Sequence, residues 1–159
     1  MSDLSHTPSP LEHVLETCLY VKSAPKAAAW YEDALGVTPV FVTDRMANFP
    51  LGPSTLLLFT LGQTGDDIKS EDGMIPHHGP TPDLLSLLNQ EGGKSLLNQH
   101  FCFAVDKPDD VDKWENRLRK KDVKVLSTMT WQKGGKSVYF EDLDGHIGEI
   151  GSRGIWPHW

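Results

Sequence analysis

Residues 100–105, His-Phe-Cys-Phe-Ala-Val, repeat the pattern of residues 16–21, Glu-Thr-Cys-Leu-Tyr-Val, at an offset of 84 residues (105 − 21). Each segment alternates along its length and is predicted to be a β-strand. Trp30 and Trp114 have the same offset, and each lies among apolar residues with helical spacing. The two halves therefore indicate an internal duplication of one strand–helix–strand–strand–strand unit.

Turn residues divide the rest of the chain. A helix is expected from Pro25 to Gly36, since proline suits a first helical turn and glycine a helix end. A second helix is expected to begin at residues 106–108. The predicted strands are 14–21, 38–42, 47–51 and 55–61 in the first unit, and 100–105, 123–128, 136–141 and 146–151 in the second. The expected divisions are a disordered leader (1–10), a first βαβββ module (11–61), a connection (62–97), a second module (98–152) and a C-terminal tail (153–159).

The connection is rich in Gly, Pro and Asp and has one short amphipathic piece at 83–88. A connection of this length in a small protein is typical of a linker or a functional loop. As a lid, it would bring His77 or His78 over a binding site. Alternatively, the leucines of 84–88 would pack against a second subunit.

Composition excludes several classes of function. With 15 basic and 22 acidic residues the formal charge is −7, and no basic stripe is present, which argues against nucleic-acid binding. No apolar run approaches the ~20 residues that span a membrane. Two cysteines cannot form a disulfide framework, and residues 1–10 do not resemble a signal peptide. A cytoplasmic location is expected.

Strand alternation places two functional candidates on equivalent faces. Phe101, Phe103 and Val105 are all apolar, so their face of the strand is expected to meet the helix. His100 and, in the first module, Glu16 then lie on the opposite face. Neither side chain is expected on a buried sheet face without a partner.

At this point the sequence resembles the vicinal oxygen chelate superfamily, which contains glyoxalases, fosfomycin-resistance proteins, extradiol dioxygenases and bleomycin-resistance proteins. The residues that carry the resemblance are 15–21, 30–36, 100–105 and 134–150, the last with its Asp-Leu-Asp-Gly turn and a glutamate four residues beyond the glycine. The resemblance implies an α+β fold in which two paired βαβββ modules form a curled eight-stranded sheet around a metal cavity.

Metal ligands in such proteins come from the first and last strands of the modules. The resemblance therefore implies Glu16, His100 and Glu149 as ligands of one divalent ion (Mn, Fe, Zn, Ni or Mg), with Glu16 and Glu149 also as catalytic residues. The fourth ligand position falls among the leucines of 56–58. Three ligands with open positions are typical of a catalytic metal site.

Five further residues are candidates for substrate binding. Ser137 and Tyr139 alternate onto one strand face, and Arg153 suits bidentate binding of an anion. Trp131 is expected at the cavity mouth, and His78 belongs to the loop that would serve as a lid.

The expected function is that of a metal-dependent, glyoxalase-like isomerase, lyase or dioxygenase acting on a small chelating substrate. Leucine at the fourth position disfavours a true glyoxalase, Glu16 disfavours extradiol cleavage, and Cys18 disfavours fosfomycin resistance. The alternative is a metal-free protein that binds a drug or metabolite, as bleomycin-resistance proteins do. A homodimer is the expected assembly where the leucines of 84–88 pack against a second subunit.

Overall fold

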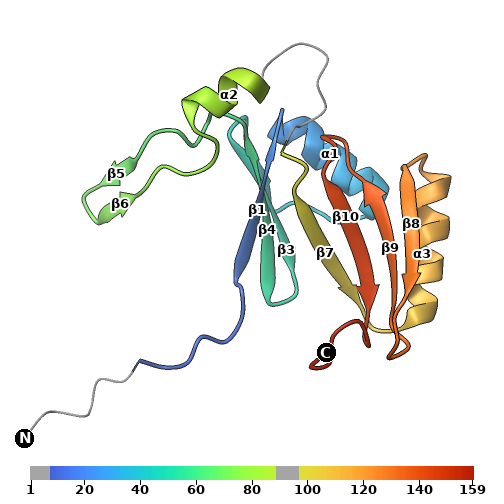
Figure 1. The fold of residues 1–159 in the computed structure, drawn as a ribbon. Coiled ribbons are helices and arrows are strands. Elements are labelled where there is room, and N and C mark those ends of the chain that lie inside the picture. The colour runs from blue at the N-terminus through green and yellow to red at the C-terminus, as the bar shows by residue number, and fades with distance from the viewer. Residues whose placement is uncertain (1–7, 89–96) are drawn as a thin grey trace, which may run out of the picture.

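The computed structural model describes residues 8–88 and 97–159 and has the α+β fold expected from the sequence (Figure 1). The first module comprises β1 (Glu16–Val21), α1 (Ala24–Leu35), β2 (Phe41–Val42), β3 (Met46–Leu51) and β4 (Ser54–Thr60). The second comprises β7 (His100–Val105), α3 (Pro108–Lys120), β8 (Val125–Thr130), β9 (Lys136–Glu141) and β10 (Ile147–Ser152). The connection holds β5 (Ile68–Ser70), β6 (Gly73–Ile75) and α2 (Pro82–Leu88).

The two modules have the same sheet topology, which confirms the duplication. The strand order is β1-β4-β3-β2 in one sheet and β7-β10-β9-β8 in the other. In each sheet the first strand of the module forms an edge, and the last strand of the module lies next to it and runs parallel to it. Within the described residues the eight module strands are divided between two four-stranded sheets and do not form one continuous eight-stranded ladder.

Local sequence accounts for the helix limits. The Ser23 hydroxyl accepts from the Lys26 amide at the start of α1, and Gly36 ends the helix with a φ of 70°, a left-handed conformation that favours glycine. Acidic residues occupy the first turn of α3 and basic residues its last turn, which complements the helix dipole.

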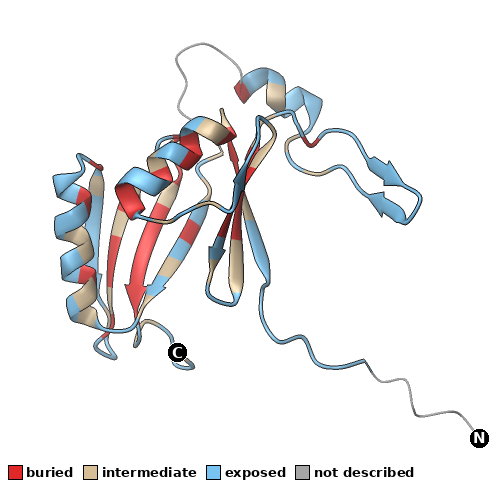
Figure 2. Cartoon of the chain, turned by 180° about the vertical axis from the view of Figure 1, so that it is seen from behind, coloured by how far each residue is buried: buried red, intermediate tan, exposed pale blue. Residues whose placement is uncertain are grey.

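One hydrophobic core joins both modules on the helix side of the sheets. Tyr31 of α1 is fully buried, and its ring lies 5.9 Å from that of Phe49 in β3 and 6.2 Å from that of Phe101 in β7. Figure 2 shows that the buried positions follow the central strands and the inner sides of the helices. The opposite faces of the two sheets lie outside this core, and on the first sheet that face carries a smaller cluster around Tyr20, Leu57 and Phe59.

The turn before β10 holds the two modules together. The Tyr31 hydroxyl donates to Asp142 (2.8 Å), and the Lys22 amide donates to Asp144 (2.7 Å). His146 of this turn is fully buried. Its Nε2 donates to the Tyr20 carbonyl (2.8 Å), while its Nδ1 accepts from the Gln99 amide (3.1 Å). These contacts fix how the modules pack within one chain.

The connection carries a projecting β5–β6 hairpin, followed by α2 at the predicted amphipathic piece (Figure 1). His77 pairs with Asp67 at 2.8 Å beside the hairpin. Of the expected leader, residues 1–7 lie outside the described residues, as do residues 89–96 of the connection; residues 8–10 have no regular secondary structure. Among the described helices none is both long and apolar enough to cross a membrane.

Candidate metal centre and ligand cavity

The candidate site lies on the face of the second sheet that is turned away from α3. Val138, Phe140 and Ile150 enter the core, so alternation turns their neighbours in β9 and β10 to the opposite face. The side chains brought together there are Ser137 and Tyr139 of β9, Glu149 of β10 and His100 of β7, as the sequence predicted for this module.

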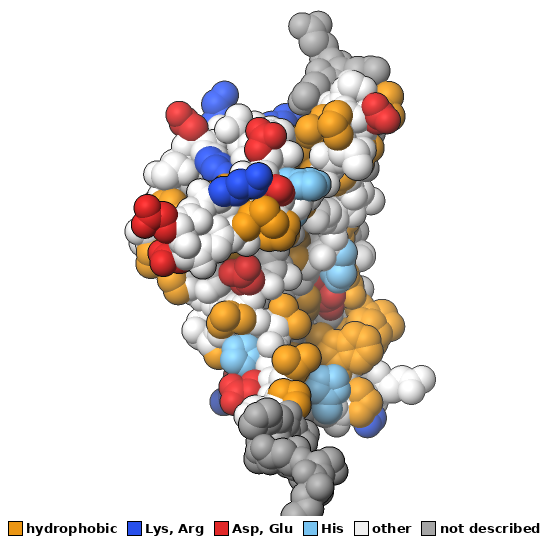
Figure 3. All heavy atoms as spheres, turned by 90° about the vertical axis from the view of Figure 1, so that its left-hand side faces the viewer, with side chains coloured by type: hydrophobic (Ala, Val, Ile, Leu, Met, Phe, Trp, Pro, Cys, Tyr) orange, Lys and Arg blue, Asp and Glu red, His pale blue; other side chains and the backbone are white. Residues whose placement is uncertain are grey.

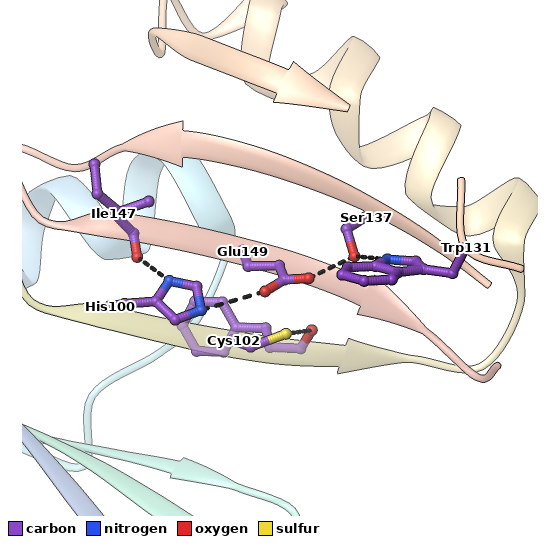
Figure 4. Close-up of polar contacts among 7 residues, drawn as sticks. His100, Cys102, Trp131, Ser137, Ile147 and Glu149 are labelled. Atoms are coloured by element: carbon purple, nitrogen blue, oxygen red, sulfur yellow. Dashed lines mark hydrogen bonds and ion pairs between the residues drawn. The ribbon is translucent and has the colours of Figure 1, made fainter. Parts of the chain in front are cut away.

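A chain of polar contacts crosses this face (Figure 4). The Trp131 indole donates to the Ser137 hydroxyl (2.9 Å), which in turn donates to Oε1 of Glu149 (2.5 Å). The other oxygen of Glu149, Oε2, lies 3.3 Å from Nε2 of His100. Nδ1 of His100 donates to the Ile147 carbonyl (3.1 Å). Glu149 is buried, whereas about half of the His100 side chain is exposed.

The contact with the Ile147 carbonyl determines what must lie between His100 and Glu149. The Ile147 carbonyl can only accept, so Nδ1 of His100 carries a proton, and in a neutral ring Nε2 presents a lone pair. That lone pair would face the Glu149 carboxylate, and two acceptors at this distance require a proton or a cation between them. A proton on Nε2 or a divalent cation meets the requirement.

The geometry fits shared coordination. Two ligands about 2.1 Å from one ion lie roughly 3.0–3.4 Å apart at tetrahedral or octahedral angles, and the His100–Glu149 separation is 3.3 Å. An imidazole nitrogen with a carboxylate oxygen suits Mn²⁺, Fe²⁺, Ni²⁺ or Zn²⁺. The contacts from Ile147 and Ser137 are of the kind that orient metal ligands.

A cavity of about 280 Å³ adjoins the pair. Its lining residues are His100, Cys102, Trp131, Tyr139, Glu149, Ile155 and Trp156. Ile155 and Trp156 belong to the C-terminal tail and were not predicted, because no strand or helix periodicity covers them. Two glycines and two tryptophans among residues 151–159 are the one sequence signal that could have drawn attention to this tail.

The electrostatics of the cavity keep its weak acids protonated. Partial burial and the neighbouring Glu149 carboxylate raise the pKa of the Cys102 thiol to about 12. The same two causes raise the pKa of the Tyr139 hydroxyl. Both groups are therefore neutral at pH 7, and Cys102 is no thiolate nucleophile there.

A larger cavity, of about 400 Å³, lies between the modules on the helix side of the second sheet. Leu35, Leu51, Phe103 and Trp114 are among its lining residues, and no titratable side chain lines it. The polar chemistry lies at the smaller cavity beside His100 and Glu149, which we therefore take as the functional site.

The family-model comparison agrees with this fold. Residues 11–150 match the glyoxalase family, described as the glyoxalase/bleomycin resistance protein/dioxygenase superfamily. The chain belongs to this superfamily. No curated protein matches it.

Solved structures of the superfamily resemble the chain over most of its length. A structure described as lactoylglutathione lyase from Agrobacterium tumefaciens is 28% identical, with a TM-score of 0.75, and the match covers 94% of this chain and 99% of that one. A glyoxalase-related enzyme from Fulvimarina pelagi has 18% identity, a TM-score of 0.60 and coverage of 92% of each chain. A glyoxalase/bleomycin resistance protein/dioxygenase from Nocardioides has 16% identity, a TM-score of 0.62 and coverage of 97% and 91%.

In this glyoxalase-superfamily chain, the structure brings His100 and Glu149 together but leaves Glu16 apart. Glu16 is exposed at the start of β1, on the face of the first sheet that also carries Cys18 and Tyr20. Across the described residues, no group of three His, Cys, Asp or Glu side chains is arranged to hold a metal ion. The register pairs Leu57 with Cys18, as it pairs Glu149 with Cys102, so Leu57 stands at the fourth ligand position.

Two predicted substrate-binding residues lie elsewhere. Arg153 donates to Asp106 (2.8 Å) and covers the Trp159 ring, and it does not line the cavity. His78 packs on the first sheet, where its Nδ1 lies 2.6 Å from the Tyr20 hydroxyl. The described part of the connection, residues 62–88 and 97, therefore contacts the first sheet and supplies none of the residues that line the cavity at His100 and Glu149.

Proposed function

We propose that this chain is a divalent-metal-dependent enzyme of the glyoxalase superfamily, acting on a small substrate that chelates the metal through oxygen atoms. The observation that carries the proposal is the 3.3 Å approach of His100 Nε2 to Glu149 Oε2, with the opposite ring nitrogen already committed to a carbonyl. The 28% identity to a protein described as a lactoylglutathione lyase makes a lyase reaction the first to test.

In this proposal His100 and Glu149 hold the ion, which when bound would supply a Lewis acid for a substrate oxygen. Ser137 keeps Glu149 oriented through its hydroxyl. Glu149, or Glu16 where it reaches the site, accepts a substrate proton. Tyr139, neutral at pH 7 because its pKa is raised, is available as a hydrogen-bond donor to a substrate oxygen.

We further propose that Glu16 completes the ligand set from a second copy of the chain. The shared core and the Asp142–His146 turn hold the modules with their helix sides together, so Glu16 and His100 stay on separate faces of one molecule. Val14 and Leu15 beside Glu16 are largely exposed and offer apolar surface for a partner. Because Cys18 and Cys102 are free thiols, we retain a reducing, cytoplasmic location in the proposal.

Elemental analysis of protein purified without added metal tests the central claim. Wild type should carry stoichiometric metal, and His100→Ala or Glu149→Gln should reduce it to background. His77→Ala is the matched control, since His77 is exposed and pairs with Asp67. Full metal content in the His100 variant would place the metal elsewhere.

Mixing variants tests the second copy. Chains with Glu16→Gln and chains with His100→Ala would each lack an intact site. In a two-fold dimer, half of the mixed dimers are heterodimers and each has one intact site of two, so mixing should restore about a quarter of the metal sites. A site within one chain would recover nothing.

The second candidate is a metal-free binding protein. It is favoured by the aromatic cavity wall and by the separation of Glu16 from the His100–Glu149 pair among the described residues. In that case Nε2 of His100 carries the proton, and a ligand binds equally well after metal is removed with a chelator.

A further inference from the structure

Four apolar or aromatic side chains line the candidate site. Trp131 and Tyr139 come from the second module, and Ile155 and Trp156 come from the tail that follows β10. The polar atoms of the cavity, by contrast, gather at His100 and Glu149. In Figure 3, hydrophobic side chains on the lower right of the surface border an acidic and a histidine side chain. The cavity therefore combines the polar His100–Glu149 pair with aromatic and apolar walls.

The tail is held in place by close packing of glycines. A Cβ at Gly135 would come 2.4 Å from the Gly154 carbonyl carbon, and one at Gly154 would come 2.8 Å from the Gly135 amide nitrogen. Only two residues without side chains allow the tail to lie this close to the β8–β9 turn. The Gly154 amide also donates to the Trp159 carbonyl (3.1 Å), which folds the tail back on itself.

Ile155 is seated in the site itself. A Cβ at Gly151 of β10 would lie 2.8 Å from Cδ1 of Ile155, 3.3 Å from Sγ of Cys102 and 3.6 Å from Oε1 of Glu149. The absence of a side chain at Gly151 thus makes room for Ile155 beside the carboxylate. Trp131 is fixed opposite by its hydrogen bond to Ser137. These walls are in place before any ligand arrives.

We infer that the ligand of this cavity carries an aromatic ring next to its oxygen head group, and that the C-terminal tail selects for that ring through Trp156 and Ile155. The inference rests on the proposed function for the head group and adds the class of its substituent. Flat rings stack on Trp and Tyr side chains, and the volume of about 280 Å³ suits one small ring with a short head group. Trp156 is 60% exposed, so one of its faces is free to receive the ring.

Three 2-hydroxy acids with the same head group test the inference: mandelate, its cyclohexyl analogue and lactate. Calorimetric titration into the full-length, metal-loaded protein should give mandelate an affinity about tenfold above that of lactate, with the cyclohexyl acid in between. Trp156→Ala should bring the three affinities within about twofold of each other while lactate is unchanged. Ile155→Ala should lower the affinity for mandelate less than Trp156→Ala does. Leu143→Ala, another exposed apolar residue but on the β9–β10 turn, is the control and should change nothing.

Several outcomes would overturn the inference and leave the proposed metal site standing. These are equal binding of the three acids, retention of the mandelate preference in Trp156→Ala, or binding of none of them while His100-dependent metal binding persists. Sedimentation of the same variants tests the alternative explanation, in which the exposed Trp156 side chain contacts a second copy of the chain. If Trp156→Ala dissociates a dimer and leaves ligand preference unchanged, the tail is a contact between copies of the chain and the inference is wrong.

Discussion

Leu57 of β4 occupies the position in the first sheet that Glu149 of β10 occupies in the second. Leu57 pairs with Cys18 on its neighbouring strand, and Glu149 pairs with Cys102. Leu57 packs with Tyr20 and Phe59, whereas Glu149 is hydrogen-bonded by Ser137 and faces His100. The repeated sheets therefore differ in the polarity of one face, and the charged pair belongs to the second module.

Replacing Leu57 with glutamate should destabilise the protein. Leu57 is 8% exposed and packs with the rings of Tyr20 and Phe59, so a carboxylate there would lose most of its solvation by water. We expect a loss of roughly 2–4 kcal/mol in the free energy of unfolding at pH 7. Burial raises the pKa of such a carboxyl, so the loss should shrink as the pH falls toward 4. Urea denaturation at both pH values checks this, with Leu57→Met as the control; a loss independent of pH would point to a steric cause.

Removing the Ser137 hydroxyl should disturb both of its partners. Ser137→Ala leaves the buried Oε1 of Glu149 without its donor and the Trp131 indole without its acceptor. We expect the free energy of unfolding to fall by about 1–3 kcal/mol and metal affinity to fall roughly tenfold or more, since residues that orient ligands contribute to binding. Denaturation, metal titration and tryptophan fluorescence measure the three effects. Thr128→Ala on the exposed strand β8 should change none of them.

The elements of this fold follow from local sequence, and their mutual packing does not. Alternation in residues 100–105 predicts both the strand β7 and the placement of His100 opposite Phe101, because side-chain direction in a strand has a period of two. The 84-residue offset predicts two like modules. It carries no information about which faces of the modules meet, which Tyr31 and the turn of residues 142–146 determine through contacts more than 100 residues apart. For this reason the separation of Glu16 from His100 was not predicted.

The tail escaped prediction for a related reason. Ile155 and Trp156 reach the cavity because Gly135 and Gly154 approach each other, a contact between two turns that no periodicity records. The full burial of His146 is invisible to local pattern for the same reason, since it depends on backbone groups of Tyr20 and Gln99 in other elements.

Alkaline conditions should unfold the protein partly through Tyr31. Burial, and then the Asp142 carboxylate, raise the pKa of the Tyr31 hydroxyl well above 10. A folded-state pKa above the unfolded value means that the stability is full below about pH 10 and is lost as the pH rises above it. Tyr31→Phe should cost about 1–2 kcal/mol at pH 7, because Asp142 loses a donor, and should weaken the loss of stability above pH 10. Part of the loss should persist in this variant, because the pKa values of Tyr20 and Tyr139 are also raised in the folded protein. Thermal denaturation from pH 7 to pH 11 measures both effects, and an unchanged alkaline slope would contradict the assignment to Tyr31.

Metal affinity should decrease as the pH falls from about 8 to 5, because a protonated imidazole cannot bind a metal ion. His100 is the ligand responsible in the proposed site. Titration of Zn²⁺ or Ni²⁺ into wild type and Glu149→Gln across this range measures the effect. An affinity that is constant with pH would show that no histidine binds the ion.

Two glycines of β10, Gly148 and Gly151, should respond differently to the same substitution by alanine. A Cβ at Gly148 would come 2.2 Å from the Phe140 ring, whereas one at Gly151 would meet Cδ1 of Ile155 at 2.8 Å. Phe140 is fully buried in the core and cannot move aside, but Ile155 belongs to the tail and its side chain can rotate. Gly148→Ala should therefore lower the free energy of unfolding by about 1–3 kcal/mol or more. Gly151→Ala should leave stability nearly unchanged and push Ile155 into the cavity, which reduces mandelate affinity more than lactate affinity. Denaturation and ligand titration of the two variants separate these effects. Equal losses of stability would mean that the tail is as rigidly packed as the core, and that the Ile155 side chain cannot rotate away from a Cβ added at Gly151.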